Sequence, residues 1–138
     1  MPRLLIFEPA FRRLEALLAL HGPALECLLM DEAGRLTLGG AEVASEEARP
    51  DAAWASSEVF QSPAARAFMV VLLKAPDLKW TQSSAAGFDH PVFAQLVGNG
   101  VRLATSHGQA VGMADYVVAG VLDHFQRGPE RRAAQAEA

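Results

Sequence analysis

The seven residues Ser83–Asp89, with the sequence Ser-Ser-Ala-Ala-Gly-Phe-Asp, are the stretch of this chain best suited to holding a ligand. They follow an apolar run and precede Pro91, a residue favoured at the first position of a helix. A loop of small residues between a strand and a helix can turn successive backbone N–H groups toward one point, where the helix dipole adds partial positive charge. Ala85, Ala86 and Gly87 leave room for that approach. The pattern predicts a site for a carboxylate or a phosphate.

Side chains near this loop offer less chemistry than its backbone. We expect Asp89 to cap the following helix or brace the loop rather than to act in catalysis, and His90 to stand at the helix start. Ser83, Ser84 and His107 do not have the spacing of a nucleophile and its base, and the sequence contains no G-x-S-x-G motif, which disfavours a hydrolase. No set of histidines and cysteines has the spacing of a zinc site.

Apolar periodicity, together with proline and glycine signals, predicts alternating strands and helices. Ser62 is expected to cap the second helix, and residues 31–50 are expected to form a surface excursion in which Arg35–Leu38 is a candidate hairpin arm. We expect strands at Leu4–Phe7, Leu25–Met30, Asp51–Ala55, Leu78–Gln82 and Val101–Thr105, and helices from Pro9 to a stop at Gly22-Pro23, from Pro63 to Ala75, from Pro91 to Val97 and from Gly112 to Gln126.

This alternation implies an α/β protein. Five strands separated by helices favour a five-stranded parallel sheet with right-handed crossovers and helices on both faces. At this chain length the pattern predicts a flavodoxin-like three-layer sandwich.

Composition limits the class of protein further. A chain of 138 residues with 51% apolar residues suits one domain with a packed core. The net charge of −4 gives no basic surface for nucleic acid or an anionic membrane. The single Cys27 lies in an apolar run and is expected to be a buried core thiol. The sequence has neither a signal segment nor an apolar run of about 20 residues, so we expect a soluble, cytoplasmic protein.

Three motifs give the chain a family resemblance: SSAAGFD at Ser83–Asp89, GVRLATSHG at Gly100–Gly108 and MADYVVAGVL at Met113–Leu122. Together they resemble the D-isomer-specific 2-hydroxyacid dehydrogenases, in which a [ST]-x-A-G-x-D loop, a G-[IV]-x-[VL]-T-N/S strand and an A-E-[YWF] helix start occur in this order. The resemblance covers the first, substrate-binding domain of that family, here residues 1–127, and implies the same flavodoxin-like fold. Thr105 and Asp115 depart from the usual Asn and Glu.

The resemblance narrows the expected ligand. In the family, backbone amides that match Ala86 and Gly87 hold the carboxylate of a 2-hydroxy or 2-oxo acid, and Ala85 precedes them in the same loop. Loops such as Ser56–Phe60 contact the rest of the substrate there, which makes Ser57 a further substrate-binding candidate. The resemblance therefore implies a domain that binds a small 2-hydroxy or 2-oxo acid, as in a glyoxylate or hydroxypyruvate reductase.

The same resemblance implies that the chemistry lies elsewhere. Family members transfer hydride with NAD or NADP, and they use an Arg and a His–Glu pair that belong to a second, Rossmann domain. Those three catalytic residues cannot be mapped onto this sequence, and Gly98-Asn99-Gly100 lacks the third glycine of a dinucleotide-binding motif. We expect no bound cofactor and no oxidation or reduction by this chain alone.

The end of the sequence predicts a connector and a partner. Residues 112–127 are expected to be an interdomain helix, and the tail at 128–138 starts a further helix-like run, which we interpret as a truncation before a Rossmann domain. Apolar surface on that helix predicts self-association into a homo-oligomer such as a dimer. His124 is expected to be a packing residue. The apolar side of this expected helix consists of Met113, Val117, Val118, Val121, Leu122 and Phe125. Its less apolar side consists of Asp115, Ala119, Asp123 and Gln126.

Two functional classes remain open from the sequence. One is the substrate domain of an NAD(P)-dependent oxidoreductase. The other is a stand-alone module that binds small carboxylates or regulates a partner without chemistry. A receiver-like domain is disfavoured, since only Glu8 and the pair Asp31-Glu32 supply acidic residues near strand ends.

Overall fold

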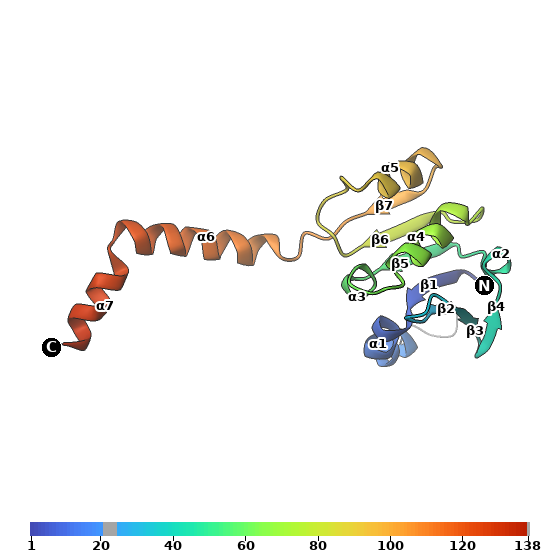
Figure 1. Cartoon of the computed structure of the whole chain (residues 1–138), viewed down its shortest axis with the longest axis horizontal. Coiled ribbons are helices and arrows are strands. Elements are labelled where there is room, and N and C mark those ends of the chain that lie inside the picture. The colour runs from blue at the N-terminus through green and yellow to red at the C-terminus, as the bar shows by residue number, and fades with distance from the viewer. Residues whose placement is uncertain (21–24, 138) are drawn as a thin grey trace. The chain divides into compact units, whose positions relative to one another are not determined.

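The computed structural model describes residues 1–20 and 25–137 of the chain (Figure 1). The chain divides into two compact units, Met1–Ser106 and His107–Ala138. The helix stop expected at Gly22-Pro23 lies outside the described residues. In the part of the chain that the structure describes, no helix is long and apolar enough to cross a membrane.

The larger unit is built on one seven-stranded sheet. Its strands are β1 (Arg3–Phe7), β2 (Glu26–Met30), β3 (Leu36–Leu38), β4 (Ala41–Val43), β5 (Ala52–Ala55), β6 (Trp80–Ser83) and β7 (Arg102–Ala104). They lie in the order β4-β3-β2-β1-β5-β6-β7 (Figure 1). Pairing is parallel across β2-β1-β5-β6-β7 and antiparallel at β3 and β4. The predicted α/β class is confirmed, whereas the prediction of a five-stranded, all-parallel sheet is wrong.

The difference comes from a hairpin beside β2. Gly39-Gly40 joins β3 to β4 with φ angles of 59° and 86°, as a two-residue hairpin turn requires. Leu36 pairs with Met30 on one side and with Val43 on the other, and it is buried. The candidate hairpin arm at Arg35–Leu38 is confirmed, because Leu36–Leu38 pairs antiparallel with Ala41–Val43, whereas the surface excursion expected of these residues is wrong. The structure places them inside the sheet.

β1 has a hydrogen-bonded neighbour on each side. Leu5 pairs with Leu28 of β2 and with Ala53 of β5, and all three residues are completely buried. Strands inside a parallel sheet have unbroken apolar sequences, because both of their faces are covered. The run at Leu4–Phe7 therefore predicted this strand correctly.

Five helices belong to this unit: α1 (Glu8–Leu20), α2 (Ser45–Ala48), α3 (Ser57–Phe60), α4 (Ala65–Lys74) and α5 (Pro91–Gly98). The sequence predicted α1, α4 and α5 but neither of the one-turn helices. The cap assigned to Ser62 is wrong, because α4 begins at Ala65 with Ala64 at the N-cap position. The Ser62 hydroxyl instead donates to the Val59 carbonyl at 2.9 Å and accepts from the Ala64 amide at 3.2 Å. It links the end of α3 to the start of α4.

The core of the unit joins the sheet to its helices. Cys27 packs against the core but is only half-buried, so the prediction of a buried thiol is confirmed in part. The partial burial raises the pKa of the thiol. The largest completely buried apolar side chains come from β1, β2, α3, α4 and α5: Leu5, Ile6, Phe7, Leu28, Met30, Val59, Phe68, Leu72 and Leu96.

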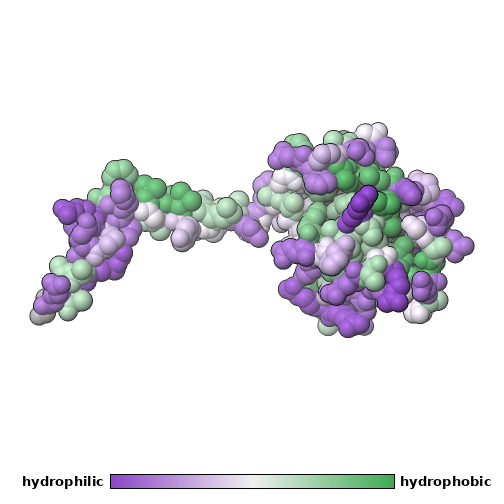
Figure 2. Space-filling model, viewed as in Figure 1, coloured by the Kyte–Doolittle hydropathy of each residue, from purple (hydrophilic) through white to green (hydrophobic). Residues whose placement is uncertain are grey.

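The smaller unit consists of α6 (Ala110–Phe125) and α7 (Gly128–Ala136), which confirms the helix-like run predicted after the connector. Asp123 accepts hydrogen bonds from Nη1 and Nη2 of Arg132 at 2.6 and 3.0 Å, which ties α7 to α6. A Cβ atom on Gly128 would lie 1.7 Å from Oδ1 of Asp123, so the link needs glycine there. Apolar side chains follow α6, and hydrophilic ones gather over α7 (Figure 2).

Truncation of Phe68 tests how far the core holds the larger unit together. We expect Phe68→Ala to lower the free energy of unfolding by about 3–5 kcal/mol, because it removes a completely buried ring and leaves a cavity. Phe88→Ala is the matched control, since the Phe88 side chain is 69% exposed and its loss should change stability little. Urea denaturation followed by circular dichroism measures both. Equal effects of the two changes would contradict this account of the core.

Asp51 anchors the amino ends of three strands. Its carboxylate accepts a hydrogen bond from the Arg3 amide at 2.9 Å, and its own backbone binds the carbonyl of Arg3 and the amide of Lys79. The hydrogen bond from the Arg3 amide is the main cause that holds the pKa of Asp51 below its ordinary value of 3.8, and Lys79 adds to it. The stabilisation is complete above the ordinary pKa and is lost as the pH falls through the lowered folded-state pKa.

Asp51→Asn should therefore lower the free energy of unfolding at neutral pH, and the deficit should shrink as the pH falls below 3.8. The asparagine keeps an acceptor oxygen but loses the charge. Urea denaturation at pH 7 and at about pH 3 measures the difference. Asp115→Asn, at an exposed position on α6, is the control and should leave stability nearly unchanged at both pH values. A deficit in unfolding free energy of equal size at both pH values would contradict the electrostatic explanation.

Candidate functional site

The candidate site lies at the carboxyl ends of β5, β6 and β7, which meet at one edge of the sheet because the three strands are parallel. Backbone hydrogen bonds continue past the strand ends. The Ser84 amide donates to the Ala55 carbonyl at 2.9 Å, and the Ser106 amide donates to the Ala85 carbonyl at 3.0 Å. The start of the loop between β6 and α5, which we call the carboxyl-edge loop (residues 84–89), is thus held by both neighbouring strands.

Beyond Ala85 the loop amides are unpaired. The Ala85 amide donates to the hydroxyl of Ser83 at 3.1 Å. The amides of residues 86–90 donate no hydrogen bond to any residue that the structure describes, and these residues are exposed. Five consecutive free N–H groups next to the start of α5 form a set of donors that suits an anion.

His90 fixes the end of the loop. Its Nδ1 atom accepts a hydrogen bond from the Val92 amide at 3.2 Å, so His90 caps α5, with Pro91 at the first turn. The expectation that His90 stands at the helix start is confirmed. The cap expected of Asp89 is wrong, because the neighbouring imidazole takes that place and the Asp89 carboxylate accepts no hydrogen bond from the described residues.

Gly87 supplies space rather than unusual backbone geometry. No residue of the carboxyl-edge loop has a positive φ angle, so successive amides are not curled into the alternating left-handed geometry of an anion-binding nest. A Cβ atom on Gly87 would meet only Oδ2 of Asp89, at 3.3 Å. The donors therefore lie along an open loop, and a carboxylate would approach them from solvent.

The four predicted substrate residues all lie at this edge. Ala85 is half-buried, whereas Ala86 and Gly87 are exposed on the loop and Ser57 is exposed at the first position of α3. The hydrogen bond between Ser84 and Ala55 joins the two segments. No hydrogen bond brings Ser57 onto the loop itself, so the structure places it at the same edge without joining it to the amides.

Two buried hydroxyl groups were missed by the sequence analysis. Ser56, directly after β5, and Thr81, within β6, are completely buried, and their hydroxyl oxygens have no hydrogen-bond partner among the described residues. Leaving a buried polar group unpaired costs about 1–3 kcal/mol. A serine immediately after an apolar strand was the available signal for Ser56, whereas nothing in the local sequence marks Thr81.

An apolar cleft of about 560 Å³ lies beside the carboxyl-edge loop. Phe88 from the loop and Thr105, directly after β7, contribute to it. Its remaining walls are Phe93, Ala94, Val97 and Leu103, from α5 and β7. None of these side chains carries a charge, so the cleft offers apolar contact next to the unpaired amides.

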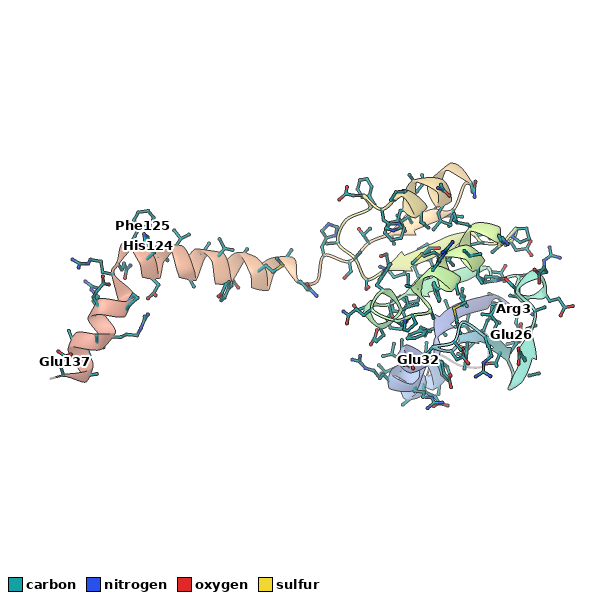
Figure 3. The ribbon with its side chains drawn as sticks, viewed as in Figure 1. Arg3, Glu26, Glu32, His124, Phe125 and Glu137 are labelled. Carbon is teal, nitrogen blue, oxygen red and sulfur yellow. The ribbon has the colours of Figure 1, made fainter. Side chains whose placement is uncertain are left out.

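His107 and His124 do not join a catalytic or metal-binding group in the part of the chain that the structure describes. His107 is exposed after β7. His124 lies edge-on to Phe125 with ring centres 5.6 Å apart (Figure 3), but both side chains are exposed, so the packing role expected of His124 stays a prediction. Among the described residues, no cluster of three His, Cys, Asp or Glu side chains could hold a metal ion.

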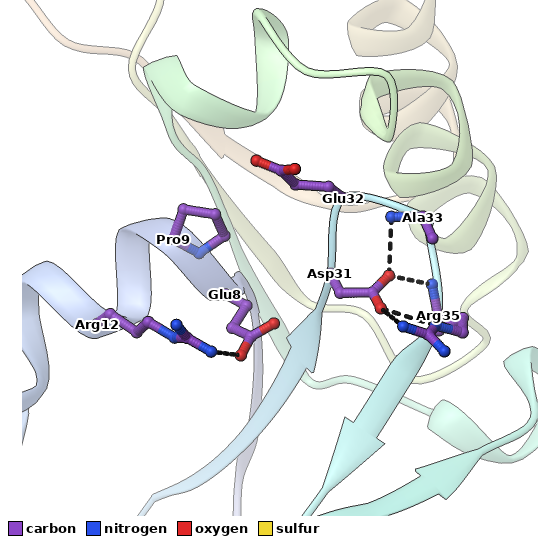
Figure 4. Close-up of a pocket in the computed structure, with 7 residues that line it drawn as sticks. All are labelled: Glu8, Pro9, Arg12, Asp31, Glu32, Ala33 and Arg35. Carbon is purple, nitrogen blue, oxygen red and sulfur yellow. Dashed lines mark hydrogen bonds and ion pairs between the residues drawn. The ribbon is translucent and has the colours of Figure 1, made fainter.

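A second, charged cleft of about 390 Å³ lies at the carboxyl ends of β1 and β2 (Figure 4). Its opposite charges pair with each other. Glu8 binds Arg12 at 2.5 Å, and Asp31 binds Arg35 at 2.7 Å. The backbone amide of Arg35 is the main cause that lowers the pKa of Asp31, with the guanidinium of Arg35 contributing as well. Because both guanidinium groups already face carboxylates, this cleft suits an anion less well than the unpaired amides do.

The turn at Gly98-Asn99-Gly100 does not have the arrangement of a dinucleotide-binding glycine turn. A dinucleotide-binding glycine turn connects a strand to a helix, so that the pyrophosphate meets the helix N-terminus. Gly98-Asn99-Gly100 has the reverse arrangement, because it ends α5 and leads into β7. No step of a reaction is therefore assigned to a cofactor on this chain.

Comparison with known proteins identifies no relative of this chain. No protein-family model, no curated protein and no solved structure matches this chain. The dehydrogenase resemblance rests on the three sequence motifs.

Replacement of Ser83 tests the first hydrogen bond of the loop. Ser83→Ala removes the acceptor of the half-buried Ala85 amide, which should cost about 1 kcal/mol and speed hydrogen exchange at that amide about fivefold. Ser84→Ala is the matched control, because the Ser84 side chain forms no hydrogen bond with the described residues. Exchange measured by NMR that is equally fast in both variants would contradict this role of Ser83.

Proposed function

We propose that this chain binds the carboxylate of a small 2-hydroxy or 2-oxo acid on the backbone amides of its carboxyl-edge loop, as the substrate-binding domain of an NAD(P)-dependent D-2-hydroxyacid dehydrogenase. The observation that carries the proposal is the run of unpaired amides at residues 86–90, exposed at the carboxyl edge of a parallel sheet and followed by the start of α5. Amide donors and a helix N-terminus bind a carboxylate through hydrogen bonds to its charged oxygens.

Strand order supports the same proposal. The parallel strands run β2-β1-β5-β6-β7, which in chain order is 2-1-3-4-5, the order of flavodoxin-like sheets. Right-handed crossovers would put α1 on one face of that sheet and α4 and α5 on the other. In such sheets ligands bind outside the carboxyl ends of the strands, which is where the carboxyl-edge loop lies.

Each part of the edge has a separate role in the proposal. Ala86 and Gly87 present their N–H groups to the carboxylate, and Ala85 keeps the loop attached to Ser106 of the neighbouring segment. Ser57, at the start of α3, faces the remainder of the acid. The apolar cleft at Phe88 accepts a short hydrocarbon side chain.

The oxidoreductase step is assigned to a separate cofactor-binding domain. Carboxylate binding is common to that function and to a stand-alone regulatory module, since both need only the loop.

Titration with glyoxylate, hydroxypyruvate and longer 2-oxo acids should shift the amide NMR signals of Ala85–Asp89. The methyl ester of glyoxylate, which lacks the negative charge, should leave them in place because it gives the amides no anion to bind. Inorganic phosphate distinguishes a carboxylate site from a general anion site. Signals that stay unchanged at millimolar 2-oxo acid would refute the proposal.

Gly87→Ala places a methyl group where the carboxylate would approach. We expect binding at least about tenfold weaker, because a hydrogen bond to a charged group contributes about 1.5–3 kcal/mol. The fold should survive, since the new Cβ meets only the flexible Asp89 side chain. Gly98→Ala is the matched control, because a Cβ atom there meets nothing within 4 Å and the residue lies at the far end of α5. Equal affinity of the two variants would argue against the loop as the site.

A further inference from the structure

Another apolar pocket, of about 480 Å³, lies in the larger unit beside α4. Phe60, the last residue of α3, borders it, together with His90 and Val92 at the start of α5, and α4 supplies the rest of its wall. All of these residues belong to the same compact unit, so the shape of the pocket is set within that unit. We call it the α4 pocket.

α4 has two apolar sides, and the pocket lies against one of them. Its sequence, ARAFMVVLLK, is charged only at its second and last positions. Phe68 and Leu72 point into the core and are completely buried or nearly so. Met69, Val70 and Leu73 follow another side of the helix and line the pocket, where Val70 is 38% exposed. A helix that is apolar nearly all round needs apolar contacts on both sides, and the α4 pocket offers the second set.

Two aromatic rings are held in place at the wall of the pocket by Phe93, which is buried. The ring of Phe60 lies edge-on to Phe93, with ring centres 6.4 Å apart and an angle of 87° between the planes. The ring of His90 meets Phe93 at 6.1 Å and 63°, and the hydrogen bond from the Val92 amide fixes it further. Phe60 and His90 are both exposed, so each offers aromatic contact to a ligand.

Arg66, the second residue of α4, gives the pocket its charge. Among the described residues that line the pocket it is the one with a permanent charge, and none of them is acidic. The guanidinium of Arg66 forms no ion pair within the described part of the chain. Its planar fork of N–H groups matches a carboxylate, which it can bind through two parallel hydrogen bonds. The pocket thus combines aromatic and apolar walls with one positive group.

We propose that the α4 pocket binds an aromatic carboxylic acid, with its ring against Phe60 and Met69 and its carboxylate on Arg66. Pockets for small ligands have volumes of about 300–1,000 Å³, mostly apolar walls and a few polar groups, and this pocket has all three features. Methionine sulfur makes favourable contacts with aromatic rings. The proposal goes beyond the carboxylate site at the carboxyl-edge loop and does not rest on it.

Two other kinds of occupant match the pocket less well. An aliphatic chain would cover the apolar wall, but it would gain nothing from two rings whose orientation is fixed. An apolar side chain of a protein segment would also cover the wall, but it would leave the guanidinium of Arg66 without an anion. An aromatic acid satisfies both parts of the pocket.

Titration of the full chain with 2-naphthoate, followed by methyl NMR, tests where the acid binds. Signals of Val97 and Leu103, in the cleft beside the carboxyl-edge loop, should stay in place. If they shift instead, the acid binds at that loop and the proposal is overturned. No shift at millimolar 2-naphthoate would also overturn it and would favour a protein segment as the occupant. The methyl signals that should shift are those of Met69, Val70, Leu73 and Val92.

Replacement of Arg66 tests the contact with the carboxylate. Arg66→Gln should weaken binding of 2-naphthoate about fivefold, because it removes the charge of an exposed guanidinium and keeps a long polar side chain. Arg131→Gln is the matched control, since Arg131 is exposed on α7 and also forms no ion pair with the described residues. Uncharged 2-naphthamide should bind equally to both variants. Calorimetry that gives the two variants equal affinity for 2-naphthoate would overturn the proposal.

Two further ligands test the aromatic assignment and its independence from the carboxyl-edge loop. Octanoate should bind about fivefold more weakly than 2-naphthoate, because it lacks a ring, and equal or tighter binding of octanoate would overturn the assignment. Excess glyoxylate should leave bound 2-naphthoate in the α4 pocket, whereas displacement would mean that both acids share the carboxyl-edge loop. If glyoxylate binds nowhere on the chain, the proposed function fails, and the shifts caused by 2-naphthoate still decide this proposal.

Discussion

The backbone pairing of β1 with β2 on one side and with β5 on the other organises the larger unit. The chain adds β2 to one edge of β1 and then crosses to the opposite edge to continue with β5, β6 and β7. Leu5, which pairs with Leu28 and Ala53 without any exposure, shows how little freedom this central strand has. Once that pairing is made, the carboxyl ends of the parallel strands lie together, and the segments that follow them share one edge.

The carboxyl-edge loop combines firm attachment with unused hydrogen-bonding capacity. Ser84 and Ala85 are bound to the neighbouring segments, and His90 caps the helix at the other end. Between these two anchor points the backbone neither continues the sheet nor starts the helix, so its N–H groups have no partner among the described residues. Small residues at Ala86 and Gly87 keep these groups accessible. A short loop held at both ends thus gives a site with little conformational entropy to lose on binding.

Sequence patterns predicted those parts of the structure that depend on local chemistry. The apolar runs at Leu4–Phe7 and Leu25–Met30 predicted two strands, and Pro91 predicted the start of α5. The strand expected at Asp51–Ala55 forms at Ala52–Ala55 despite its poor propensity, because β1 and β6 pair with it from both sides. Features set by contacts between residues far apart in the chain could not be predicted from the sequence. They include the addition of the β3–β4 hairpin to the sheet and the Thr81 hydroxyl, which has no partner among the described residues. The position of the loop was predictable from the order of the elements, whereas its lack of positive φ angles was not.

The two edge strands of the sheet limit aggregation of the larger unit. β4 and β7, the outermost strands, have three residues each, and each carries an exposed charged residue, Glu42 on β4 and Arg102 on β7. Short, charged edge strands offer few free backbone groups to another strand and place a charge where a fibril would need an apolar contact. The larger unit is therefore protected against growth by strand addition, and a concentrated solution of this chain should avoid amyloid-like assembly.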